Sequence, residues 1–235
     1  MATQVTSARL SIVITCHRFL QRLRVSMRNW CAQDAPAGSF EILVADPHSP
    51  DGTREYLATV ARAFPELRVV DVAVRHDLAR NKGALTNHAV EAAAQPWVWL
   101  ADADCVFPTD SVSRVLAQIE ATGPHLYFGR RRHLGGEATD ALIVGRRDAI
   151  TEFDRLTREA ADAATDEYPW GYTQIVPRDV IASIRYTTAI NSFARSDEVF
   201  LAACRRRGLR PRLVPGLECL HLAHPFVWHA NTTFL

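Results

Sequence analysis

Short apolar runs alternate with helical patterns along the first hundred residues, and this alternation restricts the fold more than any other feature of the sequence. The runs have the length and the branched or aromatic side chains of buried strands: Leu10–Thr15, Glu41–Ala45, Leu67–Val74 and Trp97–Ala101. Helical patterns lie between them, at about residues 20–31, 53–64 and 79–94. Strands separated by helices of this length indicate βαβ crossovers. We therefore predict an α/β fold with a mostly parallel central sheet and helices on both faces.

The second part of the chain continues the same unit. Its pattern is less regular, with a basic run at 130–133, a polar helix or loop at 149–164 and a helix from about Asp197 to Arg207 that ends at Gly208. We see no linker that separates this part. Because 235 residues suit one α/β domain, we expect a single domain over 1–235, with a first half at about 9–107 and a second at about 108–235.

Composition excludes several functional classes. With 27 Lys and Arg against 26 Asp and Glu, the chain lacks the strong positive field of nucleic-acid-binding proteins. Its five cysteines are odd in number and lack CxxC spacing, which argues against a disulfide framework or a zinc cluster. Residues 1–9 lack an apolar signal core, and no stretch approaches the roughly 18 to 20 apolar residues of a membrane span. We therefore expect a cytoplasmic protein.

Polar side chains follow three of the predicted strands at the point where each strand ends. Thr15 ends the first strand, Asp46 follows the second, and Asp102-Ala103-Asp104 follows the fourth. In open parallel sheets, ligands bind beyond the carboxyl ends of the strands. We therefore expect these side chains to line one crevice.

The strongest local signal is the pair Asp102 and Asp104. Two carboxylates at positions i and i+2, directly after a buried strand, offer hard oxygen ligands to Mg²⁺ or Mn²⁺. A divalent ion that bridges two phosphates is what a nucleotide diphosphate leaving group requires. The alternative is a solvated turn, or a cap for the helix that follows Pro108.

Four segments resemble glycosyltransferase family 2, a large inverting family of the GT-A type, in the family's own order. They are SIVITCHRF, ILVADPHSPDGT, HDLARNKGALTNHAVEAA and WVWLADADC, which together cover roughly residues 10–107. The resemblance implies a GT-A (Rossmann-like) nucleotide-diphospho-sugar transferase fold, with a nucleotide-sugar-binding first half and an acceptor-binding, catalytic second half. It also implies a metal-dependent transfer of a sugar, which we expect to come from a UDP-sugar, to an acceptor hydroxyl.

The resemblance implies roles for individual residues as well. Asp46, with the main chain near Thr15, would contact the base and ribose, and Arg80 would lie near the base or the diphosphate. Asp102 would bind ribose or metal, and Asp104 would be the direct metal ligand. The family commonly has two acids after the second strand, whereas Asp46 stands alone there. The base preference therefore stays open.

A fainter match in the second half concerns the catalytic base. The segments GYTQIVPRDV and FARSDE, followed by RRG, resemble the family's acceptor segment, in which an acid opens a helix. In this register Asp197 falls on the base, Ser196 replaces the usual preceding glutamate, and Glu198 is the substitute. Inverting transfer needs one carboxylate to take the proton of the acceptor hydroxyl. Alternatively, Ser196 caps the helix and the two acids complement its dipole.

Two histidines near the end of the chain are candidate metal ligands. His221 and His224, in CLHLAHP, resemble the late histidine that completes the metal site in some related GT-A enzymes. A neutral imidazole suits Mn²⁺ better than Mg²⁺. We favour His221, because Pro225 is typical of a turn at His224. A structural histidine is the alternative.

Two other functions remain open at this point. A sugar nucleotidyltransferase would need a glycine-rich loop after the first strand, where this chain reads TCHRF. A non-catalytic nucleotide-sugar-binding protein of the same fold would be consistent with Ser196. We expect a nucleotide-sugar donor and no nucleic-acid partner. The sequence does not define the acceptor, which could be a small molecule, a glycan or a lipid-linked glycan, or the oligomeric state.

Overall fold

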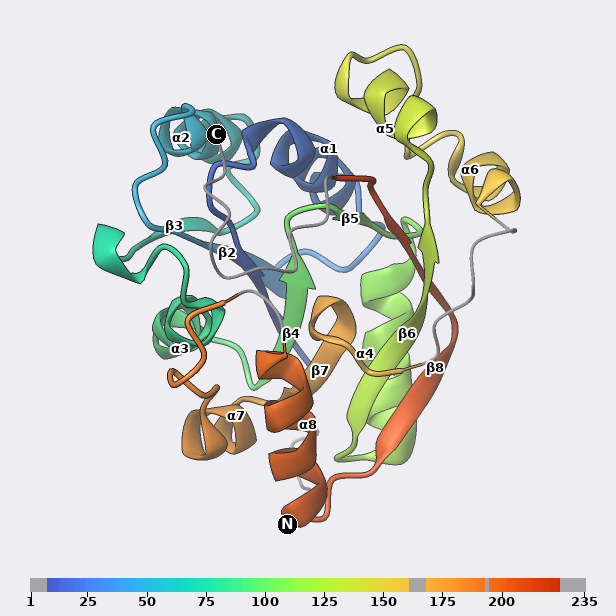
Figure 1. The fold of residues 1–235 in the computed structure, drawn as a ribbon. Coiled ribbons are helices and arrows are strands. Elements are labelled where there is room, and N and C mark those ends of the chain that lie inside the picture. The colour runs from blue at the N-terminus through green and yellow to red at the C-terminus, as the bar shows by residue number, and fades with distance from the viewer. Residues whose placement is uncertain (1–7, 161–167, 193–194, 225–235) are drawn as a thin grey trace.

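A computed structural model describes residues 8–160, 168–192 and 195–224. Within these residues the centre is one sheet of eight strands in the order β3-β2-β1-β4-β7-β6-β8-β5, with helices on both faces (Figure 1). The predicted α/β class and mostly parallel sheet are confirmed. No helix in the described part of the chain combines the length and apolar character needed to cross a membrane.

Parallel strands build the first half of the sheet: β1 (Leu10–Thr15), β2 (Phe40–Asp46), β3 (Val69–Ala73) and β4 (Trp97–Asp102). β1 lies between β2 and β4, and β3 lies beyond β2. Successive side chains of a strand face opposite sides of a sheet, so strands that are apolar at nearly every position supply two cores. The register places Thr15 opposite both Ala45 and Asp102. Three strands therefore end together at one edge, as predicted.

Helices cover both faces of this sheet. One face carries α1 (Leu20–Cys31), α2 (Thr53–Ala63) and α4 (Ser111–Thr122), and the other carries α3 (Lys82–Ala92), α7 (Arg178–Ile184) and α8 (Ser196–Arg206). On the first face Trp30 packs on Trp99 and Phe107 with ring centroids 5.1 and 5.0 Å away. On the second, Tyr186 stacks on Phe200 at 4.5 Å. The two cores fix the positions of the strands between them.

The second half extends the same sheet with strands of both directions. β7 (Gln174–Pro177) runs antiparallel to β4 and to β6 (Leu126–His133), β8 (Pro211–His221) runs parallel to β6, and β5 (Cys105–Val106) runs antiparallel to β8. In the last pair Cys105 lies opposite His221. The end of β8 is thereby placed beside the turn that follows β4.

The helix predicted from residue 79 begins later than expected. Residues His76–Leu78 form a short 3₁₀ turn, η1, and α3 begins at Lys82. Asn81 precedes it, and its side-chain oxygen accepts a hydrogen bond from the N–H of Ala84 at 2.9 Å. An asparagine in this position is a strong helix N-cap. The cap places Lys82 in the first turn of α3, where it is buried.

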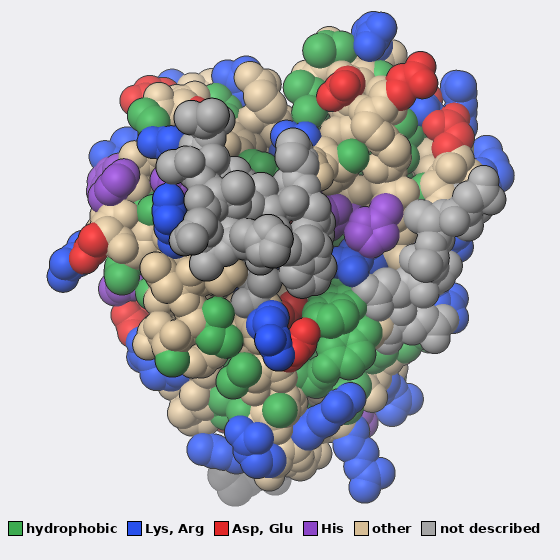
Figure 2. All heavy atoms as spheres, viewed as in Figure 1, with side chains coloured by type: hydrophobic (Ala, Val, Ile, Leu, Met, Phe, Trp, Pro, Cys, Tyr) green, Lys and Arg blue, Asp and Glu red, His purple; other side chains and the backbone are tan. Residues whose placement is uncertain are grey.

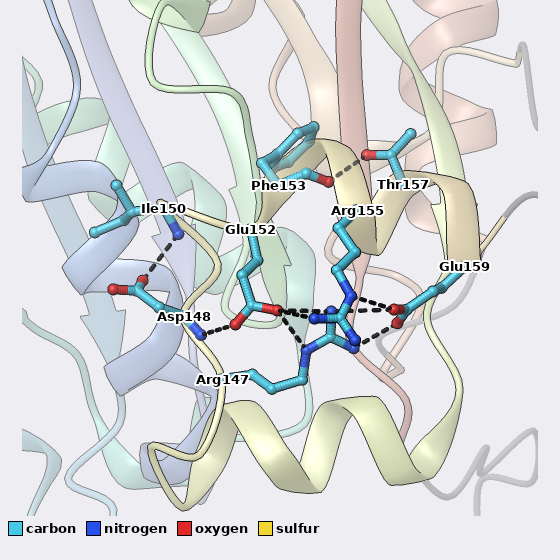
Figure 3. Close-up of polar contacts among 8 residues, drawn as sticks. All are labelled: Arg147, Asp148, Ile150, Glu152, Phe153, Arg155, Thr157 and Glu159. Carbon is cyan, nitrogen blue, oxygen red and sulfur yellow. Dashed lines mark hydrogen bonds and ion pairs between the residues drawn. The ribbon is translucent and has the colours of Figure 1, made fainter.

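A third, smaller core lies at the β5–β8 edge, where α5 (Gly136–Ile143) and α6 (Phe153–Glu159) pack. Arg147, in the loop between the two helices, donates hydrogen bonds to Glu152 and Glu159, and Arg155 contacts both acids as well (Figure 3). This network fixes α6 against the preceding loop. α6 lies within the segment predicted as a helix or loop at 149–164, whose last residues, 161–164, lie outside the described residues.

Candidate functional site

Asp104, His221 and His224 bring three ligand atoms together, all within 4.8 Å of one another. Asp104 lies in the turn after β4, His221 is the last residue of β8, and His224 follows shortly after. The Nε2 atoms of His221 and His224 lie 3.4 and 3.2 Å from Oδ2 of Asp104. The sequence analysis ranked His221 above His224, but the structure brings both imidazoles to the carboxylate.

The protonation states of this cluster suit a divalent cation. Burial by itself would raise the pKa of Asp104, but positive charge on His221 and His224 outweighs it and lowers that pKa to about 2. Burial lowers the pKa of His221, and Asp104 offsets this only in part; a lowered pKa makes it easier for the imidazole to lose its proton, as metal binding requires. One carboxylate and two imidazoles form a donor set that a first-row divalent ion such as Mn²⁺ accepts. The residues therefore fit the ion predicted at Asp104.

Asp102 is bound by a lysine that the sequence analysis did not single out. Nζ of Lys82 lies 2.6 Å from Oδ1 of Asp102, and the two side chains are 9% and 27% exposed. Burial alone would lower the pKa of Lys82, but the negative charges of Asp102 and Asp197 outweigh it and raise that pKa. The ammonium group therefore stays charged in a site otherwise dominated by carboxylates. A lysine in an expected helix is ordinarily solvated. Only the contact between α3 and the end of β4 shows that Lys82 belongs to this site.

Asp197, the predicted base, lies in the first turn of α8 beside the short turn η2 (Gly171–Thr173). Its Oδ2 accepts a hydrogen bond from the N–H of Gly171 at 3.0 Å, and its Oδ1 accepts one from the N–H of Glu198 at 3.1 Å. A Cβ added to Gly171 would lie 3.0 Å from Nζ of Lys82 and 3.3 Å from Cβ of Asp197. Lys82 and Asp197 therefore border the same narrow space. Figure 2 shows basic and acidic side chains meeting beside a hydrophobic patch near the centre of this face.

The side chain of Ser196 makes no cap for α8 within the described residues. The helix follows Arg195, which has a φ of 67° and makes no side-chain cap. The Oγ atom of Ser196 is buried and has no hydrogen-bond partner in this part of the structure. The side chain of Glu198 is 40% exposed, and its Oε2 lies 3.9 Å from Nε of Arg195. Of the two acids, Asp197 is the one that contacts the turn beside Lys82.

The predicted nucleotide-binding residues lie where β1 and β2 end. Asp46 is buried, and its two oxygens accept hydrogen bonds from the backbone N–H of Ser49, at 2.7 Å, and from its hydroxyl. The Ser49 hydroxyl oxygen in turn accepts a bond from the N–H of Arg18 at 2.8 Å and lies 3.3 Å from Nδ1 of His17. Burial raises the pKa of Asp46, against the effect of these hydrogen bonds. Asp46 therefore orders the two loops at this end of the site.

Thr15 and Arg80 lie at the same end. The Thr15 hydroxyl is buried and has no hydrogen-bond partner among the described residues. Arg80 is exposed, directly before the cap of α3, and close enough to His17 for its charge to help lower the pKa of that imidazole, after the larger effect of burial. The predicted nucleotide-binding residues thus gather around Asp46 and the predicted metal ligands around Asp104, and we call these two groups the nucleotide end and the metal end. Thr15 and Asp102 lie between them, opposite each other on adjacent strands.

A comparison with models of known families assigns the chain to one of them. The family model described as glycosyl transferase family 2 matches residues 11–184, which is most of the chain. The chain belongs to this family. The match runs from β1 to the end of α7, so it includes the turn with Asp102 and Asp104. His221 and His224 lie beyond it.

Solved structures with the same fold include two complexes with nucleotide sugars. The mannosyltransferase PcManGT from Pyrobaculum calidifontis, in complex with GDP-Man and Mn²⁺, has a TM-score of 0.63 and 17% identity, over 92% of this chain and 57% of that one. S. aureus TarS 1-349, in complex with UDP-GlcNAc, has a TM-score of 0.69 and 14% identity, over 96% of this chain and 61% of that one. The chain thus spans less than two thirds of the length of either. No curated protein sequence matches it. The likeness confirms the predicted GT-A fold.

Proposed function

We propose that this protein is a metal-dependent inverting glycosyltransferase that moves a sugar from a nucleotide diphosphate, with UDP as the expected nucleotide, to an acceptor hydroxyl. The observation that carries the proposal is the set of Asp104, His221 and His224 at the carboxyl edge of a parallel sheet, where open α/β folds bind ligands. Family membership supports it. The GDP-Man and Mn²⁺ bound to PcManGT support the donor class and the metal.

The metal end and the nucleotide end have separate tasks in this proposal. Asp104, His221 and His224 would hold the divalent ion. When bound, that ion neutralises the charge that develops on the diphosphate as the glycosidic bond breaks. Asp102 would contact the ribose, with Lys82 orienting its carboxylate. Asp46, Thr15 and Arg80 would bind the base, ribose and diphosphate, because Thr15 and Asp46 lie where β1 and β2 end.

Asp197 would act as the general base, with Glu198 as its substitute. The N–H groups of Gly171 and Glu198 each donate to one oxygen of the Asp197 carboxylate, which leaves lone pairs for an acceptor hydroxyl. The acceptor oxygen attacks the anomeric carbon from the face opposite the diphosphate. Its proton passes to Asp197, and the bond to the diphosphate breaks, so the configuration inverts.

A binding protein without turnover is the second candidate. Ser196 stands where the family usually has a glutamate, and its buried hydroxyl has no hydrogen-bond partner among the described residues. The proposed base, Asp197, therefore lacks the acid that usually precedes it. The match to a transferase family gives no support to a sugar nucleotidyltransferase.

A thermal-shift screen of nucleoside diphosphates, with and without Mn²⁺, tests the proposal. A ligand at 100 times its Kd adds about 2.7 kcal/mol to the free energy of unfolding, which raises the Tm of a domain of this size by roughly 5 to 10 °C. We expect one nucleotide to give such a shift only in the presence of Mn²⁺. Release of that nucleotide from its sugar conjugate would then distinguish an enzyme from a binding protein. Absence of any shift with any divalent ion would contradict the proposal.

A further inference from the structure

The short segment that carries His224 is bound from two sides through Ala223, the residue before it. The N–H of Ala223 donates to Oγ1 of Thr139, on α5, at 2.9 Å. Its carbonyl oxygen accepts two hydrogen bonds from Arg22, on α1, from Nε at 2.9 Å and from Nη2 at 2.5 Å. Both polar backbone groups of Ala223 are therefore fixed by side chains of helices that are distant in sequence.

The residue before α1, close to Arg22, contacts the imidazole ring of His224. The ring of Phe19, which precedes α1, meets the His224 ring edge-to-face with centroids 5.5 Å apart. The Arg22 guanidinium lies 5.1 Å from the centroid of Phe19. The Phe19 ring thus contacts both the guanidinium and the imidazole, and the backbone beside the imidazole is bound to the same guanidinium.

A second contact fixes the segment relative to the carboxylate of the site. The N–H of Leu222 donates to the carbonyl oxygen of Asp104 at 2.8 Å, and the Leu222 side chain is fully buried in the third core. This bond sets the separation between the two backbones. It does not orient His224, which lies two residues further on, beyond the end of β8. The bonds to Ala223 supply that restraint.

We infer that Arg22 is a positioning residue of the metal site, one that holds His224 so that its imidazole can share a divalent cation with Asp104 and His221. The inference rests on the metal site of the proposed function. Arg22 does not touch the ligand atoms of that site. It fixes the backbone of Ala223 and, through Phe19, the ring of His224. Groups that orient metal ligands are typically worth 10- to 100-fold in metal affinity. A guanidinium suits this task because its N–H donors are fixed in one plane, whereas an ammonium is a point donor on a flexible stem.

Mn²⁺ binding to the nucleotide-free protein, followed by the electron paramagnetic resonance signal of free Mn²⁺, tests the inference without using activity. We expect Arg22→Met to weaken Mn²⁺ binding by about 10-fold or more, and Arg22→Lys to fall between it and the wild type. Arg24→Met is the matched control, because Arg24 lies on the same helix and its guanidinium packs over Tyr56, 5.5 Å from the ring centroid. It should bind Mn²⁺ like the wild type.

A double-mutant cycle with His224→Ala shows whether Arg22 acts through His224. In the His224→Ala background, Arg22→Met should cause no further loss of Mn²⁺ affinity. An equal loss in both backgrounds would overturn the inference, because Arg22 would then act on the fold as a whole.

If Arg22→Met does not fold, Arg22→Lys takes its place in the cycle. No further loss of Mn²⁺ affinity in the His224→Ala background would again support the inference, and an equal loss in both backgrounds would overturn it. A wild type that binds no Mn²⁺ would remove the proposed metal site together with this role. A wild type that binds Mn²⁺ no better than Arg22→Met or Arg22→Lys would refute the positioning role alone.

Discussion

Replacing Asp197 by asparagine keeps the size of the side chain but removes its charge and one of its two acceptor oxygens. In the folded protein those oxygens accept the N–H groups of Gly171 and Glu198, at 3.0 and 3.1 Å. An amide has one acceptor oxygen and an NH₂ group, so one of these N–H groups would face another donor. A hydrogen bond to a charged group contributes about 1.5 to 3 kcal/mol, and an acid in the first turn of a helix about 0.3 to 1 kcal/mol. We therefore expect the free energy of unfolding to fall by about 2 to 4 kcal/mol.

The effect on chemistry should be larger than the effect on stability. If Asp197 only takes the acceptor proton, Asp197→Asn keeps its affinity for UDP while turnover falls by about 10²- to 10⁴-fold. Titration calorimetry with Mn²⁺ gives the affinity. Release of UDP from a UDP-sugar, with water in place of the acceptor, gives the turnover. Glu198→Gln is the matched control, because its side chain is 40% exposed and lies 3.9 Å from Arg195, and a surface ion pair contributes only about 0 to 1 kcal/mol.

Two outcomes would refute this reasoning. Near-normal turnover in Asp197→Asn, combined with a large loss in Glu198→Gln, would make Glu198 the base. A parallel loss of UDP affinity and turnover in Asp197→Asn would instead make Asp197 a donor-binding residue. In either case the hydrogen bond from Gly171 to Asp197 would be structural rather than catalytic.

Two further changes test the nucleotide end and the packing of α3. Asp46→Ala should weaken UDP binding both with and without Mn²⁺, because Asp46 fixes Ser49 and the loops around it; a loss confined to samples with Mn²⁺ would assign Asp46 to the metal site. Gly83→Ala should lower the free energy of unfolding by about 1 to 3 kcal/mol, because the added Cβ would lie 2.0 Å from the carbonyl oxygen of Thr187. Gly136→Ala is the control, because its added Cβ meets nothing within 4 Å. Denaturant unfolding that gives both variants the same stability would show that α3 does not pack as described.

The first half of the fold could be predicted because its signals are local. β1 and β4 are apolar at nearly every position and are bounded by polar residues, so their extent and their burial on both faces follow from the sequence. The parallel order then requires their carboxyl ends to lie at one edge. This is why the sequence predicts Thr15 and Asp102 at one edge, where the register of β1 and β4 places them opposite each other.

The rest of the site depends on contacts between residues that are far apart in the chain. Lys82 contacts Asp102 only because Asn81 caps α3, and the periodicity of that segment does not show the cap. Arg22 and Ala223 are separated by 201 positions, and no local pattern connects them. His224 looked like a turn residue because of the following proline. Its place beside Asp104 follows from the pairing of β8 with β5 together with the hydrogen bonds that fix Ala223.

The affinity for UDP, measured by titration calorimetry with and without Mn²⁺ in the wild type and in Asp104→Ala, tests the central claim most directly. Asp104 is buried and faces both His221 and His224, so its removal takes the carboxylate out of the donor set. The account predicts that Mn²⁺ strengthens UDP binding to the wild type and has no effect on Asp104→Ala, while the metal-free affinities are equal. An unchanged enhancement by Mn²⁺ in Asp104→Ala would contradict the account.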